Sequence, residues 1–282
     1  MQGNRRSRTR RQVVAWPAGV TLVALAAACF DAAPPRGAAE TPDGPVNAVA
    51  RILEDGGTVF AIRPAEMADL EAVRMMQVQQ ADFVFLTLER GPWDMTGLRS
   101  FLGTMRQVAD ESDDPLQPLP VLLRIPPVRD LGPDVTRQRV LQALASGVDG
   151  IIFPHVQSPE EVQVALTSLG DPAWPMNPHG SLIGVPMIED RVAVERAREI
   201  LGVPGVRVTF LGPMSLGEAY DGDPEAVEQA IQSVLAVCKE LGVACGITAG
   251  VEDVAERVEQ GFRFFVLRDE VAIDVGRRAA GR

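Results

Sequence analysis

The chain has 282 residues, of which 46% are hydrophobic and 23% are charged. It therefore holds enough apolar material for a folded core, and disordered, collagen-like and disulfide-stapled classes are excluded. A chain of this length suits two small domains or one α/β barrel of about 250 residues. The formal net charge of −11 repels phosphate backbones, so nucleic-acid binding is disfavoured and a small molecule or a protein is the expected partner.

The N-terminus has the layout of an export signal. Arginines are concentrated between Arg5 and Arg11, and an apolar stretch from Val13 to Ala28 follows them. A basic segment before a short apolar one is typical of a secretory signal, and this stretch is shorter than the roughly 20 residues of a membrane span. We predict a signal peptide over residues 1–28, with an uncleaved anchor or a misassigned start codon as the alternative.

Two finer patterns concern the route of export. The run Leu25 to Cys29 resembles a bacterial lipobox, in which the cysteine is acylated, although the leucine lies four rather than three residues before Cys29. Residues Thr9 to Val14 resemble a twin-arginine signal. The expectation is an exported protein, either periplasmic or anchored to a membrane by lipid on Cys29. Residues 29–45, rich in Ala, Pro and Gly, are predicted to form a flexible linker.

From residue 46 onward, short apolar runs alternate with longer amphipathic segments, which is typical of parallel β/α architecture. Eight apolar runs predict strands, over Thr58–Arg63, Asp82–Leu88, Val121–Ile125, Gly150–Val156, Leu182–Ile188, Arg207–Leu211, Gly246–Ala249 and Phe262–Leu267. Helix starts are predicted at Ser158 and Asp223, each followed by proline and acid. We predict a TIM (β/α)8 barrel over residues 46–282, with a doubly wound sheet as the alternative.

In a TIM barrel, functional residues lie at the C-terminal ends of the strands. The residues at these ends, several of them polar, are Arg63, Glu89, Arg90, Arg124, Pro154, His155, Glu189, Asp190, Gly212, Pro213, Met214, Ser215, Thr248, Arg268 and Asp269. Charges that follow buried runs are costly without a partner. Any one of them can simply pair with another or cap a helix, but the convergence of several at one rim favours a site.

Four segments of the chain carry a resemblance to a known family. They are Phe85–Asp94 (FLTLERGPWD), Val121–Pro126 (VLLRIP), Pro186–Glu189 (PMIE) and Phe210–Leu216 (FLGPMSL). In sequence, order and spacing they resemble the HpcH/HpaI aldolase and citrate lyase family, over about Gly56 to Asp269. The resemblance implies a TIM barrel with carbon–carbon lyase activity on a 2-oxo or 2-hydroxy acid. It also implies a pyruvate enolate bound to a divalent metal such as Mg²⁺, Mn²⁺ or Co²⁺.

The resemblance also assigns expected roles to individual positions. Glu189 matches the metal-binding glutamate, Arg124 the arginine that stabilises the enolate, and Glu89 the glutamate beside the family's catalytic histidine–aspartate dyad. Arg90 occupies the position of the dyad histidine and is a candidate catalytic residue with Arg124 and Glu89. The candidate substrate-binding residues are Gly212, Pro213, Ser215 and His155.

Three positions depart from the family pattern. The dyad histidine is replaced by Arg90, the dyad aspartate by Thr87, and the second metal carboxylate by Ser215. Arginine cannot shuttle protons near neutral pH, and serine is a poor ligand for hard cations beside a carboxylate. We therefore expect reduced metal affinity. His155 is a candidate replacement base or ligand, with a packed or helix-capping histidine as the alternative.

Other functions follow from the same residues. Schiff-base aldolase chemistry is excluded, because the only lysine, Lys239, falls on the surface side of a predicted outer helix. A catalytically degenerate protein that binds an organic acid anion outside the cytoplasm is one alternative, with Arg90 and Arg124 directed at one anion. An interaction protein without a ligand is another. Residues 268–282 predict a short, poor last helix interrupted by Gly276, so a monomer or dimer is expected rather than the family's hexamer.

Overall fold

The computed structural model describes residues 44–78, 80–112 and 117–282. The predicted signal peptide, the lipidation site Cys29 and nearly all of the predicted linker lie outside the described residues, and they stay predictions. Within the described part of the chain, no helix combines the length and the apolar character needed to cross a bilayer.

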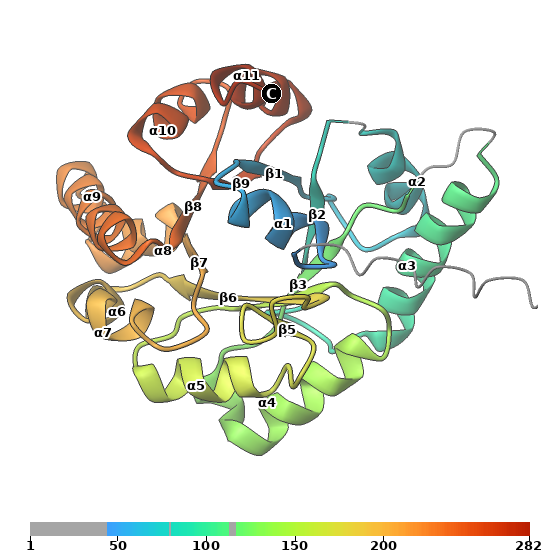
Figure 1. The fold of residues 1–282 in the computed structure, drawn as a ribbon, viewed down its shortest axis with the longest axis horizontal. Helices are drawn as coiled ribbons and strands as arrows, with labels where there is room; N and C mark the ends of the chain where they lie inside the picture. The colour runs from blue at the N-terminus through green and yellow to red at the C-terminus, as the bar shows by residue number, and fades with distance from the viewer. Residues whose placement is uncertain (1–43, 79, 113–116) are drawn as a thin grey trace, which may run out of the picture. The chain divides into compact units, whose positions relative to one another are not determined.

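Parallel strands form a closed barrel (Figure 1). The described strands are β1 (Val59–Ile62), β2 (Phe83–Thr87), β3 (Val121–Arg124), β4 (Gly150–Phe153), β5 (Ala173–Trp174), β6 (Leu182–Ile188), β7 (Val208–Leu211), β8 (Ala244–Ala249) and β9 (Phe264–Leu267). The barrel closes because β4 pairs with β6, whereas the two-residue β5 pairs with β6 alone. All eight predicted strands and the predicted TIM barrel are confirmed, and β5 is an addition.

Helices surround this barrel (Figure 1). They are α1 (Ala48–Glu54), α2 (Asp69–Gln77), α3 (Met95–Asp110), α4 (Val128–Leu144), α5 (Pro159–Thr167), α6 (Arg191–Glu195), α7 (Ala197–Leu201), α8 (Pro213–Ala219), α9 (Pro224–Leu241), α10 (Val254–Gln260) and α11 (Glu270–Ala279). Both predicted caps are confirmed. Ser158 accepts a hydrogen bond from the backbone N–H of Glu161, and Asp223 accepts from the first turn of α9.

Alternate side chains along each strand fill the barrel interior, because side chains on a strand repeat with a period of two. In β2, for example, Phe83 and Phe85 face inward and belong to the interior cluster, whereas Val84 and Leu86 pack under the helices. The inward aromatic rings contact each other, with 4.8 Å between the ring centroids of Phe83 and Phe264. This phase determines which residues beyond the strand ends point along the barrel axis.

Helix α1 covers the N-terminal end of the barrel. The side chain of Asn47 accepts from the N–H of Ala50 at 3.1 Å and donates to the carbonyl of Asp149 at 2.9 Å. Asp149 immediately precedes β4, so this contact holds the start of α1 at the strand beginnings. Val49 and Leu53 are buried in the same cluster as the barrel interior. A ligand therefore has to enter from the opposite, C-terminal end.

The last helix, α11, differs from the interrupted helix that the sequence predicts. Gly276 was expected to interrupt it, but the helix runs through this position. A Cβ atom on Gly276 would lie 2.6 Å from a ring carbon of Phe60 in β1, so the glycine permits a close approach of helix and strand. Ala272 and Ile273 are also buried. The helix thus packs on its own barrel, and the number of associating copies stays a prediction.

Candidate functional site

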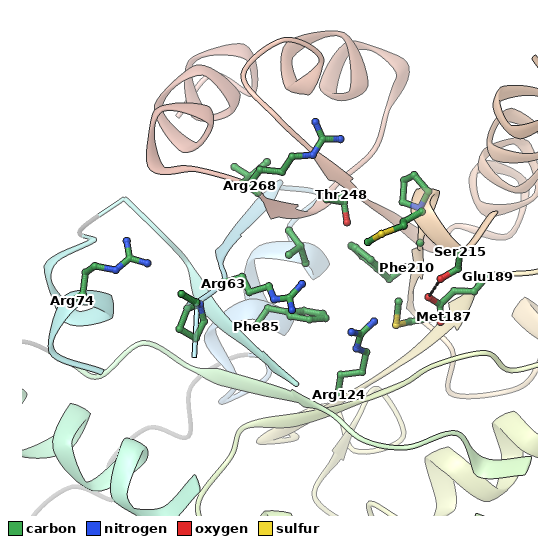
Figure 2. A pocket seen from close by; sticks show the side chains of 17 residues that line it. Arg63, Arg74, Phe85, Arg124, Met187, Glu189, Phe210, Ser215, Thr248 and Arg268 are labelled. Atoms are coloured by element: carbon green, nitrogen blue, oxygen red, sulfur yellow. Dashed lines mark hydrogen bonds between the residues drawn. The ribbon is translucent and has the colours of Figure 1, made fainter. Parts of the chain in front are cut away.

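A cavity of about 830 Å³ opens at the C-terminal ends of the strands (Figure 2). Residues that follow β1, β6, β7 and β9 line it, together with residues within the strands, such as Arg124 at the end of β3, and Arg74 of α2. Its charged lining consists of four arginines and one acid, which are Arg63, Arg74, Arg124, Arg268 and Glu189. Among the described residues the cavity is therefore predominantly cationic, in a chain whose net charge is −11.

The alternation of inward and outward side chains along each strand determines where these charged side chains point. Arg63 continues the inward series of β1, Arg124 ends that of β3, and Glu189 continues that of β6. Arg90 lies beyond β2, in a bend that follows the end of the strand at Thr87. Arg90 is exposed and is not among the residues that line the cavity. The structure thus brings Arg124 and Glu189 into one cavity and does not bring Arg90 into its lining.

Arg124 is held from the side of β2. One terminal nitrogen lies 2.9 Å from Oε2 of Glu89, and Nε donates to the hydroxyl of Thr87 at 3.1 Å. The guanidinium lies over the ring of Phe85, 5.5 Å from its centroid. Burial lowers the pKa of Arg124, while the charges of Glu89 and Glu189 oppose that shift. Arginine stays protonated under such a change, so the cavity keeps a fixed, oriented cation.

His155 links two carboxylates. Its Nε2 lies 3.2 Å from Oε1 of Glu89, and its Nδ1 lies 3.6 Å from Oε2 of Glu189. The residue follows β4 with a φ of 53°, a left-handed conformation that turns its ring toward both acids. Its carbonyl accepts a hydrogen bond from Arg129. His155 is therefore part of a charged network, but it is not among the residues that line the cavity, and its substrate-binding role stays a prediction.

The network shifts the pKa values of both partners. The hydrogen bond to Glu89 raises the pKa of His155, although burial opposes this shift. Burial raises the pKa of Glu89, but the hydrogen bond from His155 and the charge of Arg124 outweigh it, so that this pKa lies below its ordinary value. Both shifts favour an imidazolium–carboxylate pair.

Glu189 is the most enclosed charge at the site, with a side chain that is 2% exposed. Oε1 accepts from the hydroxyl of Ser215 at 3.0 Å, and Oε2 accepts from the backbone N–H of His155 at 3.0 Å. Gly212 makes room for it, because a Cβ atom there would lie 2.5 Å from Oε1. Gly212, Pro213 and Ser215 all line the cavity. Gly212 and the first turn of α8 therefore form one wall around the carboxylate.

The residues present do not fit a tightly held divalent metal. Glu189 is the only carboxylate among the described residues that line the cavity, and the hydroxyl of Ser215 donates to it. No group of three His, Cys, Asp or Glu side chains in the described ranges could hold a metal ion. Mg²⁺ and its relatives require several oxygen ligands and are usually held by one or two carboxylates with water. The Mg²⁺, Mn²⁺ or Co²⁺ cofactor stays a prediction.

Sequence reasoning placed Arg63 and Arg268 at strand ends but did not select them as site residues. Both line the cavity. The signal that identifies them is the alternation within each strand, because Arg63 follows Val59 and Ala61 in phase, and Arg268 follows Phe264 and Val266. His155 lacks such a signal, since its direction comes from a left-handed turn.

The fold and the site define a TIM barrel with a cavity at the C-terminal strand ends, built around a buried glutamate and an arginine. The sequence model of the HpcH/HpaI aldolase/citrate lyase family matches residues 66–271. This span is most of the chain, and the chain belongs to this family.

One curated relative agrees with this assignment. A 2-dehydro-3,6-dideoxy-6-sulfogluconate aldolase of Pseudomonas putida is 26% identical over 159 residues, which are 47% of this chain and 62% of that protein. The match thus spans less than two thirds of this curated relative.

Two solved structures share the fold. An HpcH/HpaI family protein of Burkholderia cenocepacia has a TM-score of 0.65 at 21% identity, covering 83% of this chain and 97% of that chain. A citrate lyase beta subunit of Mycobacterium tuberculosis, complexed with oxaloacetate and magnesium, has a TM-score of 0.56 at 16% identity, covering 80% and 98%.

Proposed function

We propose that the cavity binds a small organic acid anion of the pyruvate or lactate type. The observation that carries this proposal is that Arg124 and Glu189 project into one cavity (Figure 2). Thr87 and Glu89 use only part of the N–H donors of Arg124, so further donors can bind a carboxylate in the cavity. The barrel wall excludes water behind these groups, which strengthens a charged hydrogen bond.

The carboxylate of Glu189 affects whether the site binds a 2-hydroxy acid or a 2-oxo acid better. A 2-hydroxy acid can place its carboxylate on Arg124 and donate its hydroxyl hydrogen to Glu189. A 2-oxo acid presents only acceptor oxygens, which the carboxylate of Glu189 repels. Without a bridging cation, the site therefore suits a hydroxy acid better than an oxo acid.

A second candidate function is carbon–carbon lyase activity on a 2-oxo or 2-hydroxy acid. Membership of an aldolase family supports it, and one observation in the structure favours it. His155 contacts both Glu89 and Glu189, and histidine is the side chain that most readily takes and gives a proton near neutral pH. If a divalent metal bound here, Glu189 would be the one carboxylate among the described cavity residues to hold it, and the metal would supply polarisation of a keto group.

Binding and turnover can be measured separately. Calorimetry with lactate, pyruvate and oxalate, with and without Mg²⁺, reports binding, and exchange of the pyruvate methyl protons in D₂O reports enolisation. Arg124→Gln should abolish binding, because the anion loses its fixed cation. Arg139→Gln is the matched control, since Arg139 stacks on Trp93 and lies outside the cavity lining.

The outcomes separate the two functions. Binding without proton exchange in Mg²⁺, Mn²⁺ or Co²⁺ supports an anion-binding protein. Metal-dependent exchange that Arg124→Gln lowers by about 10²–10³ supports a lyase, because one such donor to a developing oxyanion is worth that much. Failure of all three acids to bind would contradict both functions.

A further inference from the structure

The arginines that line the cavity differ in their charge balance. Arg124 pairs with Glu89 at 2.9 Å, Arg74 pairs with Glu71 and Glu270, and Arg268 pairs with Glu252. Arg63 makes no hydrogen bond or ion pair with another described residue. It is thus the one cavity arginine whose charge no described acid balances.

Arg63 and Arg124 face the same space. Figure 2 shows the two guanidinium groups beside Phe85, directed into the cavity from β1 and β3. The charge of Arg63 contributes to the lowered pKa of Arg124, after burial, which is the largest cause. Two like charges that share a cavity repel each other, and a negatively charged group near both relieves that repulsion.

The cavity is also larger than a three-carbon acid requires. Its volume of about 830 Å³ lies in the upper part of the range of small-molecule sites, roughly 300–1,000 Å³. Ser215 is on the side of Glu189, whereas Arg63 lies on the other side of Phe85 (Figure 2). A ligand held at Arg124 and Glu189 can therefore extend toward Arg63.

We propose that Arg63 recognises a second acidic group, so that the ligand of this cavity is a dicarboxylate rather than a monocarboxylate. One carboxylate binds Arg124 and the other pairs with Arg63, whose planar guanidinium matches the geometry of a carboxylate. This inference rests on the proposed function, in which Arg124 binds the first carboxylate. Arg63 is then the residue that selects among organic acids.

The test uses two acids that share a 2-hydroxy acid head. Lactate carries one carboxylate, and malate, used as both enantiomers, carries a second. Calorimetry at low ionic strength avoids screening of the exposed Arg63 charge. In the wild-type protein, malate should bind about tenfold more tightly than lactate, the size of one charge-assisted hydrogen bond.

Two variants complete the design. Arg63→Gln should weaken malate binding about tenfold more than it weakens lactate binding, which removes the preference for malate. Its melting temperature without ligand should not fall, because Arg63 is exposed and unpaired among the described residues. Arg268→Gln removes a charge from the same cavity wall and should keep the preference, since Glu252 already pairs with Arg268.

The outcomes distinguish this inference from the proposed function. If lactate and malate bind equally well to the wild-type protein, or if Arg63→Gln keeps the malate preference, the inference is wrong and the proposed function stands. If neither acid binds, the proposed function fails and the inference fails with it.

Discussion

Oε1 of Glu89 lies 3.2 Å from Nε2 of His155 and thereby joins the end of β2 to the turn after β4. Glu89 also holds Arg124, and His155 also contacts Glu189. Cations and anions thus alternate along one connected network. A change at either end alters the charge balance of the whole, which makes His155 a useful reporter of the site.

The first prediction concerns the titration of His155. Because the hydrogen bond to Glu89 raises its pKa, we expect the imidazole to titrate above the ordinary value of about 6.5. A raised pKa in the folded state stabilises the protein fully below the unfolded value, and this contribution is lost as pH rises through the folded pKa. Urea unfolding should show this loss, and histidine NMR signals should give the pKa directly.

Variants separate the contribution of His155 from that of other groups. His155→Asn should remove the loss of stability on the alkaline side, and asparagine tolerates the left-handed backbone at this position. His179→Asn, at the only other histidine, should leave this alkaline loss of stability unchanged. Glu89 affects stability in a different pH range. Because its pKa is lowered in the folded protein, it stabilises the fold above its unfolded pKa, and this contribution is lost as pH falls through its folded pKa. An unshifted His155 titration would contradict the network.

The second prediction concerns the packing of α11. Gly276→Ala should destabilise the protein, because the new Cβ would meet Phe60 at 2.6 Å and Val254 at 2.9 Å. Overpacking costs about 1–3 kcal/mol, which exceeds the roughly 1 kcal/mol gained from the helix propensity of alanine. Gly103→Ala in α3 is the control, since a Cβ there meets nothing within 4 Å and should stabilise. Equal effects on the free energy of unfolding would contradict this packing.

The sequence predicted the barrel well because the fold depends on repeated local patterns. Each apolar run that predicted a strand lies in the barrel, and Ser158 and Asp223 cap their helices as expected. The prediction of an interrupted last helix is wrong, because helix propensity alone does not determine the role of Gly276. Its role comes from contact with Phe60, which is distant in sequence and could not be inferred from the helix itself.

The site was predicted less completely. Arg124, Glu189 and Ser215 were found from strand ends and from the family resemblance, and they lie in one cavity. Arg90 matches a family position, but it lies in the bend after β2, is exposed and does not line the cavity. Applying the strand alternation to β1 identifies Arg63. The contacts of His155 with two acids depend on a left-handed turn, and a single sequence gives no sign of that geometry.

The third prediction concerns export, which we propose from the N-terminal pattern alone. If Cys29 is acylated, Cys29→Ser should abolish labelling by a lipid analogue and move the protein from the membrane to the soluble fraction. Changing a buried cysteine such as Cys238 to serine is a control for the loss of a thiol. Full-length, unprocessed protein in the cytosol of its host would contradict export.

The fourth prediction tests the missing second carboxylate. The hydroxyl of Ser215 lies 3.0 Å from Oε1 of Glu189, so Ser215→Asp would place two carboxylates side by side. Without metal they should repel each other and lower the melting temperature, and with Mn²⁺ both can act as ligands. We expect Mn²⁺ to bind the variant at least about tenfold more tightly than the wild type, measured by calorimetry.

Ser215→Ala is the control for this substitution, because it removes the hydroxyl without adding a charge. Tight Mn²⁺ binding by the wild-type protein, unchanged in Ser215→Asp, would show that the metal is held by another set of ligands.

The last prediction distinguishes anion binding from lyase activity at Glu189. In the anion-binding function, Glu189→Gln removes a negative charge from the anion's surroundings, and the glutamine amide can donate to a keto oxygen. Pyruvate should then bind more tightly, on the order of tenfold, the size of a screened interaction between like charges in one cavity. Lactate should change less, because the glutamine oxygen still accepts its hydroxyl hydrogen. The pKa of His155 should also fall, since the charge of Glu189 helps to raise it.

In the lyase function the same substitution has the opposite effect on pyruvate. Glu189→Gln would remove the one carboxylate that the cavity offers to a metal, so Mn²⁺ binding and the exchange of pyruvate methyl protons should both be lost. Glu252→Gln provides the control, since it makes the same charge change on an exposed partner of Arg268. Because pyruvate affinity rises in one case and falls in the other, calorimetry on this pair of variants decides between the two functions.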